Sequence, residues 1–171
     1  MLINDLYKNQ SIRIPKKKEM EFIEFIDQME VEIIKIVEKA GYSIEENTPL
    51  CLLSKNYVGF MKKRQKKIII CTDNAKKKVG YTYLRKNNTD IFERAAIHIK
   101  KAIRHEAVHI AQECNNGKLL DLNQKLRMNP SKNKALEGSL KISTEVEKEK
   151  QAYILEDKPK LIKNELSKYC L

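Results

Sequence analysis

Two histidines and one glutamate near the middle of the chain form the pattern with the clearest chemical meaning. The segment 102–114 reads AIRHEAVHIAQEC, so His105 and His109 lie four positions apart and Glu106 follows the first histidine. Side chains four residues apart share one face of a helix at about 5–6 Å, which allows two imidazoles to bind one Zn²⁺. Glu106 points in another direction and can contact a water molecule beside the metal. The spacing predicts zinc-dependent hydrolysis with His105 and His109 as ligands and Glu106 as the general base.

The third metal ligand is expected to be a carboxylate from a later helix. A catalytic zinc usually binds three protein side chains and leaves one position for water, and no histidine follows His109. The predicted helix over residues 143–157 carries Glu145 and Glu149 on the stripe that leads into its apolar face. We predict Glu149 as the third ligand, with Glu145 as the reserve. A solvated acidic helix, paired with its own lysines, is the competing interpretation.

The supporting groups of such a centre cannot be chosen from the sequence alone. His98 lies seven residues before His105, which on a helix is about 10 Å along the axis, so we expect an ordinary core or surface histidine there. Each ligating imidazole needs an acceptor for its other N–H, and the oxyanion of a hydrolytic reaction needs a donor. The candidates are Glu145 and Glu156 for the first role and Tyr81, Tyr83 and Tyr153 for the second.

The hydrophobic pattern predicts one α+β domain over residues 1–171, mostly helical with a small antiparallel or mixed sheet beside the helix that carries the histidines. Helices are expected over residues 16–41, 91–114, 143–157 and 160–170, a sheet over 50–84, and a loop region that covers the site over 118–142. Within the sheet segment the pattern indicates strands at Leu50–Leu53, Tyr57–Met61, Lys67–Thr72 and Val79–Leu84, with a turn at Asp73–Ala75.

The charge of the chain bears on its partners. The net charge is +11, from 34 basic and 23 acidic residues, which is one signature of nucleic-acid binding. Most of the basic residues are lysines, whereas base and phosphate recognition favours arginine. We therefore attribute the charge to compositional bias and expect a peptide or protein substrate. Two alternatives stay open: a zinc-binding interaction module without hydrolytic activity, and a basic nucleic-acid-associated protein.

The apolar runs indicate the compartment, and the compartment bears on the state of the cysteines. No stretch approaches the ~20 apolar residues of a membrane helix, and the N-terminal residues contain no apolar run typical of a secretory signal. We therefore expect a cytoplasmic protein without a membrane partner. Its four cysteines are widely spaced, with no Cys-x-x-Cys pair, so we expect them to be buried free thiols. They are Cys51, Cys71, Cys114 and Cys170.

The segment AIRHEAVHIAQEC resembles the active-site helix of the zincin metallopeptidases. The segment Glu149–Ala152, EKQA, is similar to the Glu-x-x-Ala third-ligand segment of gluzincin-like minimal peptidases, including the ImmA/IrrE group. A looser likeness extends to the SprT-like minimal domains. The resemblance implies a zinc peptidase in which His105, His109 and Glu149 hold the metal. It also implies a sheet whose edge strand, Lys67–Thr72, lies above the cleft and pairs with an extended peptide.

Overall fold

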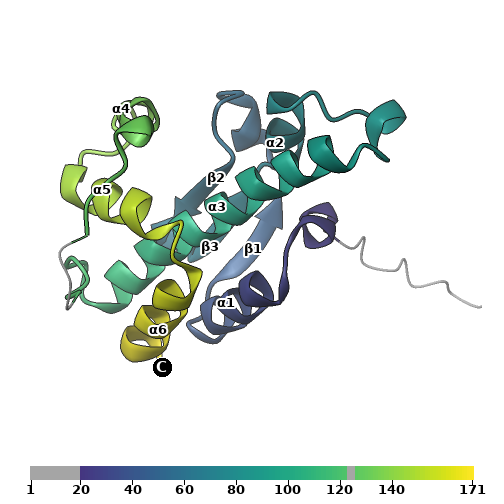
Figure 1. The fold of residues 1–171 in the computed structure, drawn as a ribbon. Coiled ribbons are helices and arrows are strands. Elements are labelled where there is room, and N and C mark those ends of the chain that lie inside the picture. The colour runs from purple at the N-terminus through teal and green to yellow at the C-terminus, as the bar shows by residue number, and fades with distance from the viewer. Residues whose placement is uncertain (1–19, 123–125) are drawn as a thin grey trace, which may run out of the picture.

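The computed structural model describes residues 20–122 and 126–171. In these residues the chain forms an α+β fold with six α-helices and one mixed three-stranded sheet (Figure 1). The helices are α1 Gln28–Lys39, α2 Thr72–Lys78, α3 Thr89–Cys114, α4 Asn133–Ser139, α5 Val146–Leu155 and α6 Pro159–Cys170. The strands are β1 Ser43–Glu46, β2 Gly59–Lys62 and β3 Lys67–Ile70. Within the described ranges, no helix is both long and apolar enough to cross a membrane.

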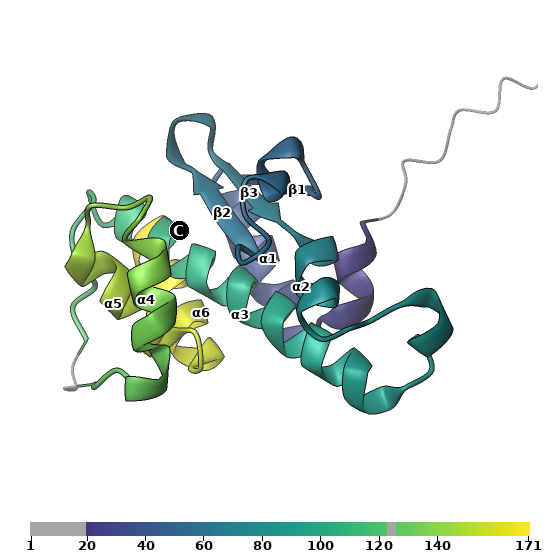
Figure 2. The same ribbon diagram turned by 90° about the horizontal axis from the view of Figure 1, so that it is seen from above.

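Helix α3 is the element around which the others pack. It begins at Asn88, whose side chain accepts a hydrogen bond from the backbone N–H of Ile91 at 3.1 Å. It ends before Asn116 and Gly117, which both have positive φ. Figure 2 shows the sheet on one side of α3, with α4 and α5 gathered around its C-terminal half. The helix expected over 91–114 is thus confirmed, with its apolar face in the core.

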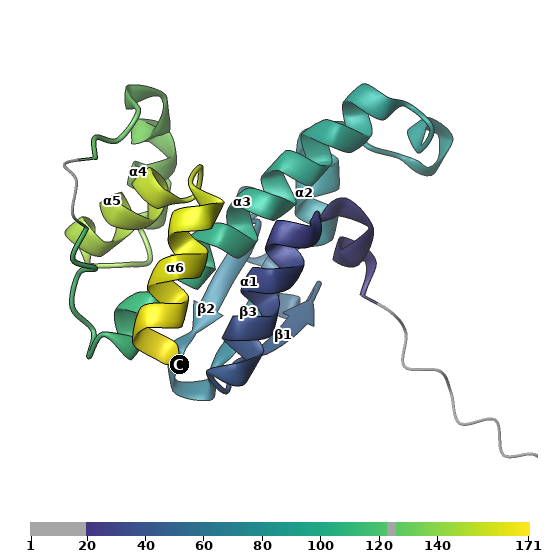
Figure 3. The same cartoon turned by 60° about the horizontal axis from the view of Figure 1, so that its bottom comes forward.

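Helices α1 and α6 lie side by side on α3 and close the core on the side away from the sheet (Figure 3). The expected helix over 16–41 is wrong in its first part. Residues 16–19 lie outside the described residues, Glu21–Phe25 form a 3₁₀ turn, and α1 begins only after Asp27. Asp27 and Glu30 form a capping box, which satisfies the free N–H groups of a helix that starts at this point. The capping box at Asp27 therefore sets the start of the helix, although apolar residues continue with helical spacing on its N-terminal side.

The sheet has the order β1-β3-β2, with β1 parallel and β2 antiparallel to β3. The expectation that Lys67–Thr72 is an edge strand is therefore wrong, because the unpredicted strand β1 pairs with its outer side. The edge nearest α3 and α5 is β2 instead. Ile68 and Ile70 of β3 face the main core, whereas Ile69 packs with Cys51 and Cys71 on the opposite face of the sheet.

Three of the smaller elements expected over 50–84 are also wrong. The segment around Leu50–Leu53 is a 3₁₀ turn, Asp73–Ala75 belong to α2, and Val79–Leu84 form no strand. The buried side chain of Asn74 explains the first two differences. Its amide donates hydrogen bonds to the backbone carbonyls of Cys51, Ser54 and Tyr57 at 2.8–3.1 Å. This amide satisfies carbonyls that a strand would have paired with a neighbour.

The four cysteines form two disulfides, Cys51–Cys71 and Cys114–Cys170, and none is free. The expectation of buried free thiols is therefore wrong. The paired cysteines are 20 and 56 residues apart in the chain, so no Cys-x-x-Cys spacing indicates either disulfide. Stable disulfides are typical of oxidising compartments, whereas the cytoplasmic location expected from the N-terminal residues implies a reducing one.

We expect the Cys114–Cys170 disulfide to contribute strongly to stability, because it closes a long loop between the end of α3 and the last turn of α6. Replacing both cysteines by serine should lower the free energy of unfolding by about 4 kcal/mol, measured by urea unfolding without reductant. Under native conditions the wild type should show no thiol that reacts with a thiol reagent. Four reactive thiols in freshly purified, folded protein would contradict the pairing.

Candidate metal centre

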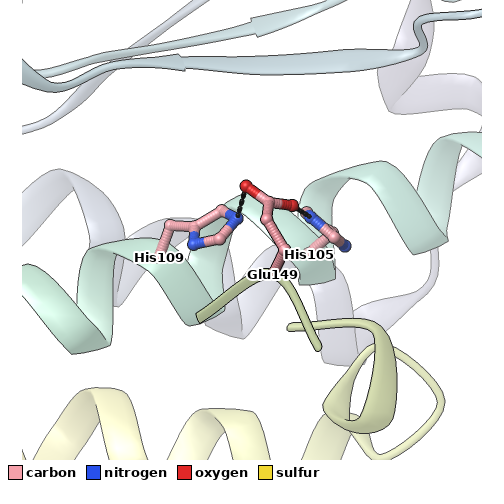
Figure 4. Close-up of side chains that lie close together, drawn as sticks. All are labelled: His105, His109 and Glu149. Carbon is pink, nitrogen blue, oxygen red and sulfur yellow. Dashed lines mark hydrogen bonds and ion pairs between the residues drawn. The ribbon is translucent and has the colours of Figure 1, made fainter. Parts of the chain in front are cut away.

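The side chains of His105, His109 and Glu149 meet at the contact between α3 and α5. The carboxylate of Glu149 lies between the two imidazoles (Figure 4), with one oxygen 3.2 Å from Nε2 of His105 and the other 3.4 Å from Nε2 of His109. The three side chains are only 10–12% exposed. Each offers one ligand atom, and these atoms all lie within 4.8 Å of one another.

This cluster has the chemistry and the dimensions of a metal site. In a tetrahedral zinc centre with bonds of ~2.0–2.1 Å, neighbouring ligand atoms are roughly 3.3 Å apart. The distances from Glu149 to the two Nε2 atoms, 3.2 and 3.4 Å, match that spacing. Two imidazoles and one carboxylate form a set that suits zinc. These three residues could therefore hold a divalent cation.

The outer nitrogen of each imidazole is held by a separate acceptor. Nδ1 of His105 lies 3.2 Å from a carboxylate oxygen of Glu156, and the other oxygen of Glu156 lies 2.9 Å from Nζ of Lys132. Lys132 also forms an ion pair with Asp157. Glu156 accepts a hydrogen bond from Nδ1–H of His105, which directs Nε2 of this ring toward Glu149.

A chain of two amides does the same for His109. Nδ1 of His109 lies 2.9 Å from Oε1 of Gln112, whose amide nitrogen donates to Oε1 of Gln151 at 3.0 Å. Gln151 is itself fixed by the backbone of Leu120, whose N–H donates to Oε1 and whose carbonyl accepts from Nε2. This network orients the Gln112 oxygen toward His109, so the ring keeps its proton on Nδ1.

Glu106 lies beside the cluster, between α3 and the β2 edge. A Cβ added at Gly59 of β2 would lie 3.2 Å from Oε1 of Glu106 and 3.2 Å from the Cβ of Ala102. A glycine on the strand and a small alanine on the helix thus allow the sheet to approach α3 at Glu106. A cleft of 840 Å³ opens here between α3, the segment before β2, and the residues around α4. Glu106 and His105 both line it.

The electrostatics favour a positive charge between these groups. Burial alone lowers the pKa of His105, but hydrogen bonds to Glu149 and Glu156 outweigh it and raise the pKa to about 10. Burial raises the pKa of Glu149, yet hydrogen bonds to both histidines bring it below its ordinary value. Burial raises the pKa of Glu106, which brings this carboxylate closer to the range of a useful base at neutral pH. The cluster thus stabilises a proton on His105 at the position where a metal cation would bind.

The other side chains considered from the sequence fall into different places. Glu145 is exposed and forms an ion pair with Lys148, so it does not share the cluster. Tyr153 lines the cleft, with its ring 4.5 Å from that of His105. Tyr81 packs instead against Phe25 and Phe92, and the side chain of Tyr83 is exposed.

Sequence reasoning missed Gln112 and Lys132. Gln112 lies three residues after His109, on the same side of a helix, so its position offered a signal. Lys132 offered no comparable signal, because it lies 24 residues before Glu156 and on a different element. The expected loop region 118–142 does cover the site, in part as the 3₁₀ turn Pro130–Lys132 and as α4.

Fold and site together define a small α+β domain in which two helices bring a histidine pair and a glutamate to one point. A family model for a domain of unknown function, DUF8637, matches residues 22–171, and the chain belongs to this family. No curated protein and no solved structure matches the chain. The matched range contains every residue of the metal cluster and both disulfides.

We expect Glu149→Ala to abolish metal binding, because it removes the ligand from α5 and leaves two imidazoles on one helix. Elemental analysis of protein purified without chelators should show about one zinc per wild-type chain and almost none in the variant. Glu145→Ala is the matched control and should keep its metal. Equal zinc in Glu149→Ala and the wild type would exclude this carboxylate as a ligand.

A second expectation concerns the amide chain behind His109. Gln112→Leu keeps the size of the side chain but removes the acceptor for Nδ1, so zinc affinity should fall roughly 10- to 100-fold in a competition titration with a chelator. Gln65→Leu, at an exposed glutamine in the β2–β3 connection, serves as control. Unchanged affinity in Gln112→Leu would show that this hydrogen bond does not orient the ligand.

Proposed function

We propose that this protein is a zinc-dependent metallopeptidase of the zincin type, which hydrolyses peptide bonds with Glu106 as general base. The observation that carries the proposal is the position of Glu149 between the Nε2 atoms of His105 and His109, with Glu106 beside them on the wall of an open cleft. The likeness of residues 102–114 to the active-site helix of zincins points to the same activity.

The residues in and around the cluster would each have a different role in the reaction. A zinc ion held by His105, His109 and Glu149 would lower the pKa of a water ligand toward neutrality and polarise the scissile carbonyl. Glu106 would accept a proton from the attacking water and deliver it to the leaving amine. Its buried position beside β2 keeps the carboxylate poorly solvated, and this raises its pKa. Glu156 and Gln112 hold the imidazoles in the orientation that this chemistry needs.

The substrate backbone would pair with β2. This strand bonds to β3 on one side only, and the segment 56–59 at its start lines the cleft directly beside Glu106. An exposed edge presents free N–H and C=O groups, to which an extended peptide can add as a further strand. The edge that faces the site is thus β2 and not the Lys67–Thr72 segment. A peptide paired with β2 would place one of its peptide bonds beside Glu106.

Tyr153 is the candidate for stabilising the oxyanion. Its ring packs edge-on against His105, and its hydroxyl interacts with Oγ of Ser139 at 2.7 Å and the carbonyl of Ala135 at 3.1 Å. Burial raises its pKa to about 12, so the group stays a neutral O–H donor at neutral pH. A rotation of the side chain away from α4 would direct this donor into the cleft.

The decisive experiment separates metal binding from hydrolysis. Glu106→Gln should keep its zinc and its fold, because Glu106 is not a ligand, while cleavage of an unstructured peptide library falls at least about 100-fold. Cleavage products are measured by mass spectrometry. Glu113→Gln, the same substitution further along α3 and outside the cleft, is the matched control and should cleave normally. A chelator should abolish the wild-type activity, and added zinc should restore it.

Two outcomes would oppose the proposal. Full activity in Glu106→Gln would remove the assigned base. Stoichiometric zinc in a wild-type protein that cleaves no peptide or denatured protein would favour a zinc-binding interaction module instead.

A further inference from the structure

The cleft beside the candidate metal site is lined by a lysine and a histidine at the end formed by α2 and the first half of α3. Lys78, at the end of α2, and His98, on the first half of α3, both line this cleft. Helix α2 packs beside α3 (Figure 1), which brings the two side chains into the same electrostatic environment. His98 is half-buried, and its pKa is lowered by burial and by the nearby charges of Lys78 and Lys101.

Lys78 differs from Lys101 and Lys132, two other lysines of the cleft, because their charges are balanced by carboxylates. Lys101 and Lys132 both form ion pairs with Asp157, and Lys132 also pairs with Glu156. Among the residues that the structure describes, Lys78 has no carboxylate within ion-pair distance. Burial lowers the pKa of Lys78, and no acidic neighbour opposes that effect. An ammonium on the wall of the cleft without a counter-charge favours an anionic ligand.

The place of this group relative to the metal cluster defines what kind of ligand fits. His98 and His105 are seven residues apart on one helix, which is about 10 Å along the axis. An extended peptide advances ~3.3 Å per residue, so this distance corresponds to about three residues. A peptide that runs along β2 through the cleft would therefore present a side chain to Lys78 and His98 about three residues away from the reacting bond.

We propose that Lys78 and His98 form a subsite for an acidic side chain, so that the protein selects peptides with an aspartate or glutamate about three residues from the scissile bond. The position in the peptide rests on the proposed peptidase function, while the preference for an acidic side chain rests on the cleft alone. Lys78 supplies the charge and His98 an N–H donor for the carboxylate. Lys101 and Lys132 are already paired with carboxylates, and Lys134 and Lys141 lie on and just after α4, so Lys78 is the lysine of the cleft that acts together with His98.

Binding to catalytically inactive protein tests the subsite without hydrolysis. Short unstructured peptides carry one aspartate, moved through successive positions, or asparagine at the same position, and affinity for Glu106→Gln protein is measured by fluorescence anisotropy. The aspartate peptide of the best register should bind roughly five- to tenfold more tightly than its asparagine partner. Adding Lys78→Gln should remove this ratio, and His98→Leu should reduce it. Lys77→Gln, an exposed neighbour that does not line the cleft, should leave the ratio unchanged.

A charge-reversal variant tests whether the loss of preference in Lys78→Gln results from misfolding. Lys78→Glu should reverse the preference, so that a peptide with lysine at the favoured position binds more tightly than one with aspartate. A damaged fold cannot produce such a switch. Equal affinity for aspartate and asparagine peptides at every position would overturn the subsite.

The same peptides, incubated with wild-type protein, separate this inference from the proposed function. Cleavage without any preference for aspartate would overturn the acidic subsite and leave the peptidase in place. Tighter binding of aspartate peptides with no cleavage would overturn the peptidase and support the anionic subsite as a binding feature.

Discussion

The contact of the Glu149 carboxylate with the imidazoles of His105 and His109 links α5 to α3, and the rest of the structure supports it. Glu149 reaches from α5 to two side chains on successive turns of α3, and the neighbouring contacts keep all three in place. Burying three ionisable groups is costly unless each finds partners. Here each imidazole has a carboxylate on one nitrogen and a fixed acceptor on the other. The hydrogen bonds of this arrangement therefore offset much of the cost of burial.

The rest of the fold can be understood as support for this contact. Helices α1 and α6 hold α3 from one side, and the buried Glu30 on α1 pairs with Arg104, the residue directly before His105. On the other side, β2 approaches α3 at Gly59, where a larger side chain would collide with Glu106. The disulfide at Cys51 and the amide of Asn74 fix the segment that leads into β2. Both walls of the cleft are thus held by contacts outside the cluster of His105, His109 and Glu149.

The sequence predicted the parts of the fold that depend on local periodicity. The spacing in α3 and the stripe on α5 placed His105, His109 and Glu149 on facing helices, and the structure brings these side chains together. Strand β1 was missed because its four residues, SIEE, are mostly polar and gain their order from pairing with β3. The break before Asp27 was missed because apolar periodicity continues across it. Both disulfides depend on chain segments that approach only in the folded state, so no local pattern marks them.

The second disulfide bears on how the site is assembled. Every residue from 115 to 169 lies within a ring closed between the last turn of α3 and the last turn of α6, and Glu149 is inside that ring. In an unfolded but oxidised chain, the glutamate cannot drift far from the histidine pair, which lies only a few residues outside the ring. The entropy of bringing acid and imidazoles together is then largely removed in advance. Oxidation of two thiols would thereby raise the local concentration of Glu149 near the two histidines before any helix has formed.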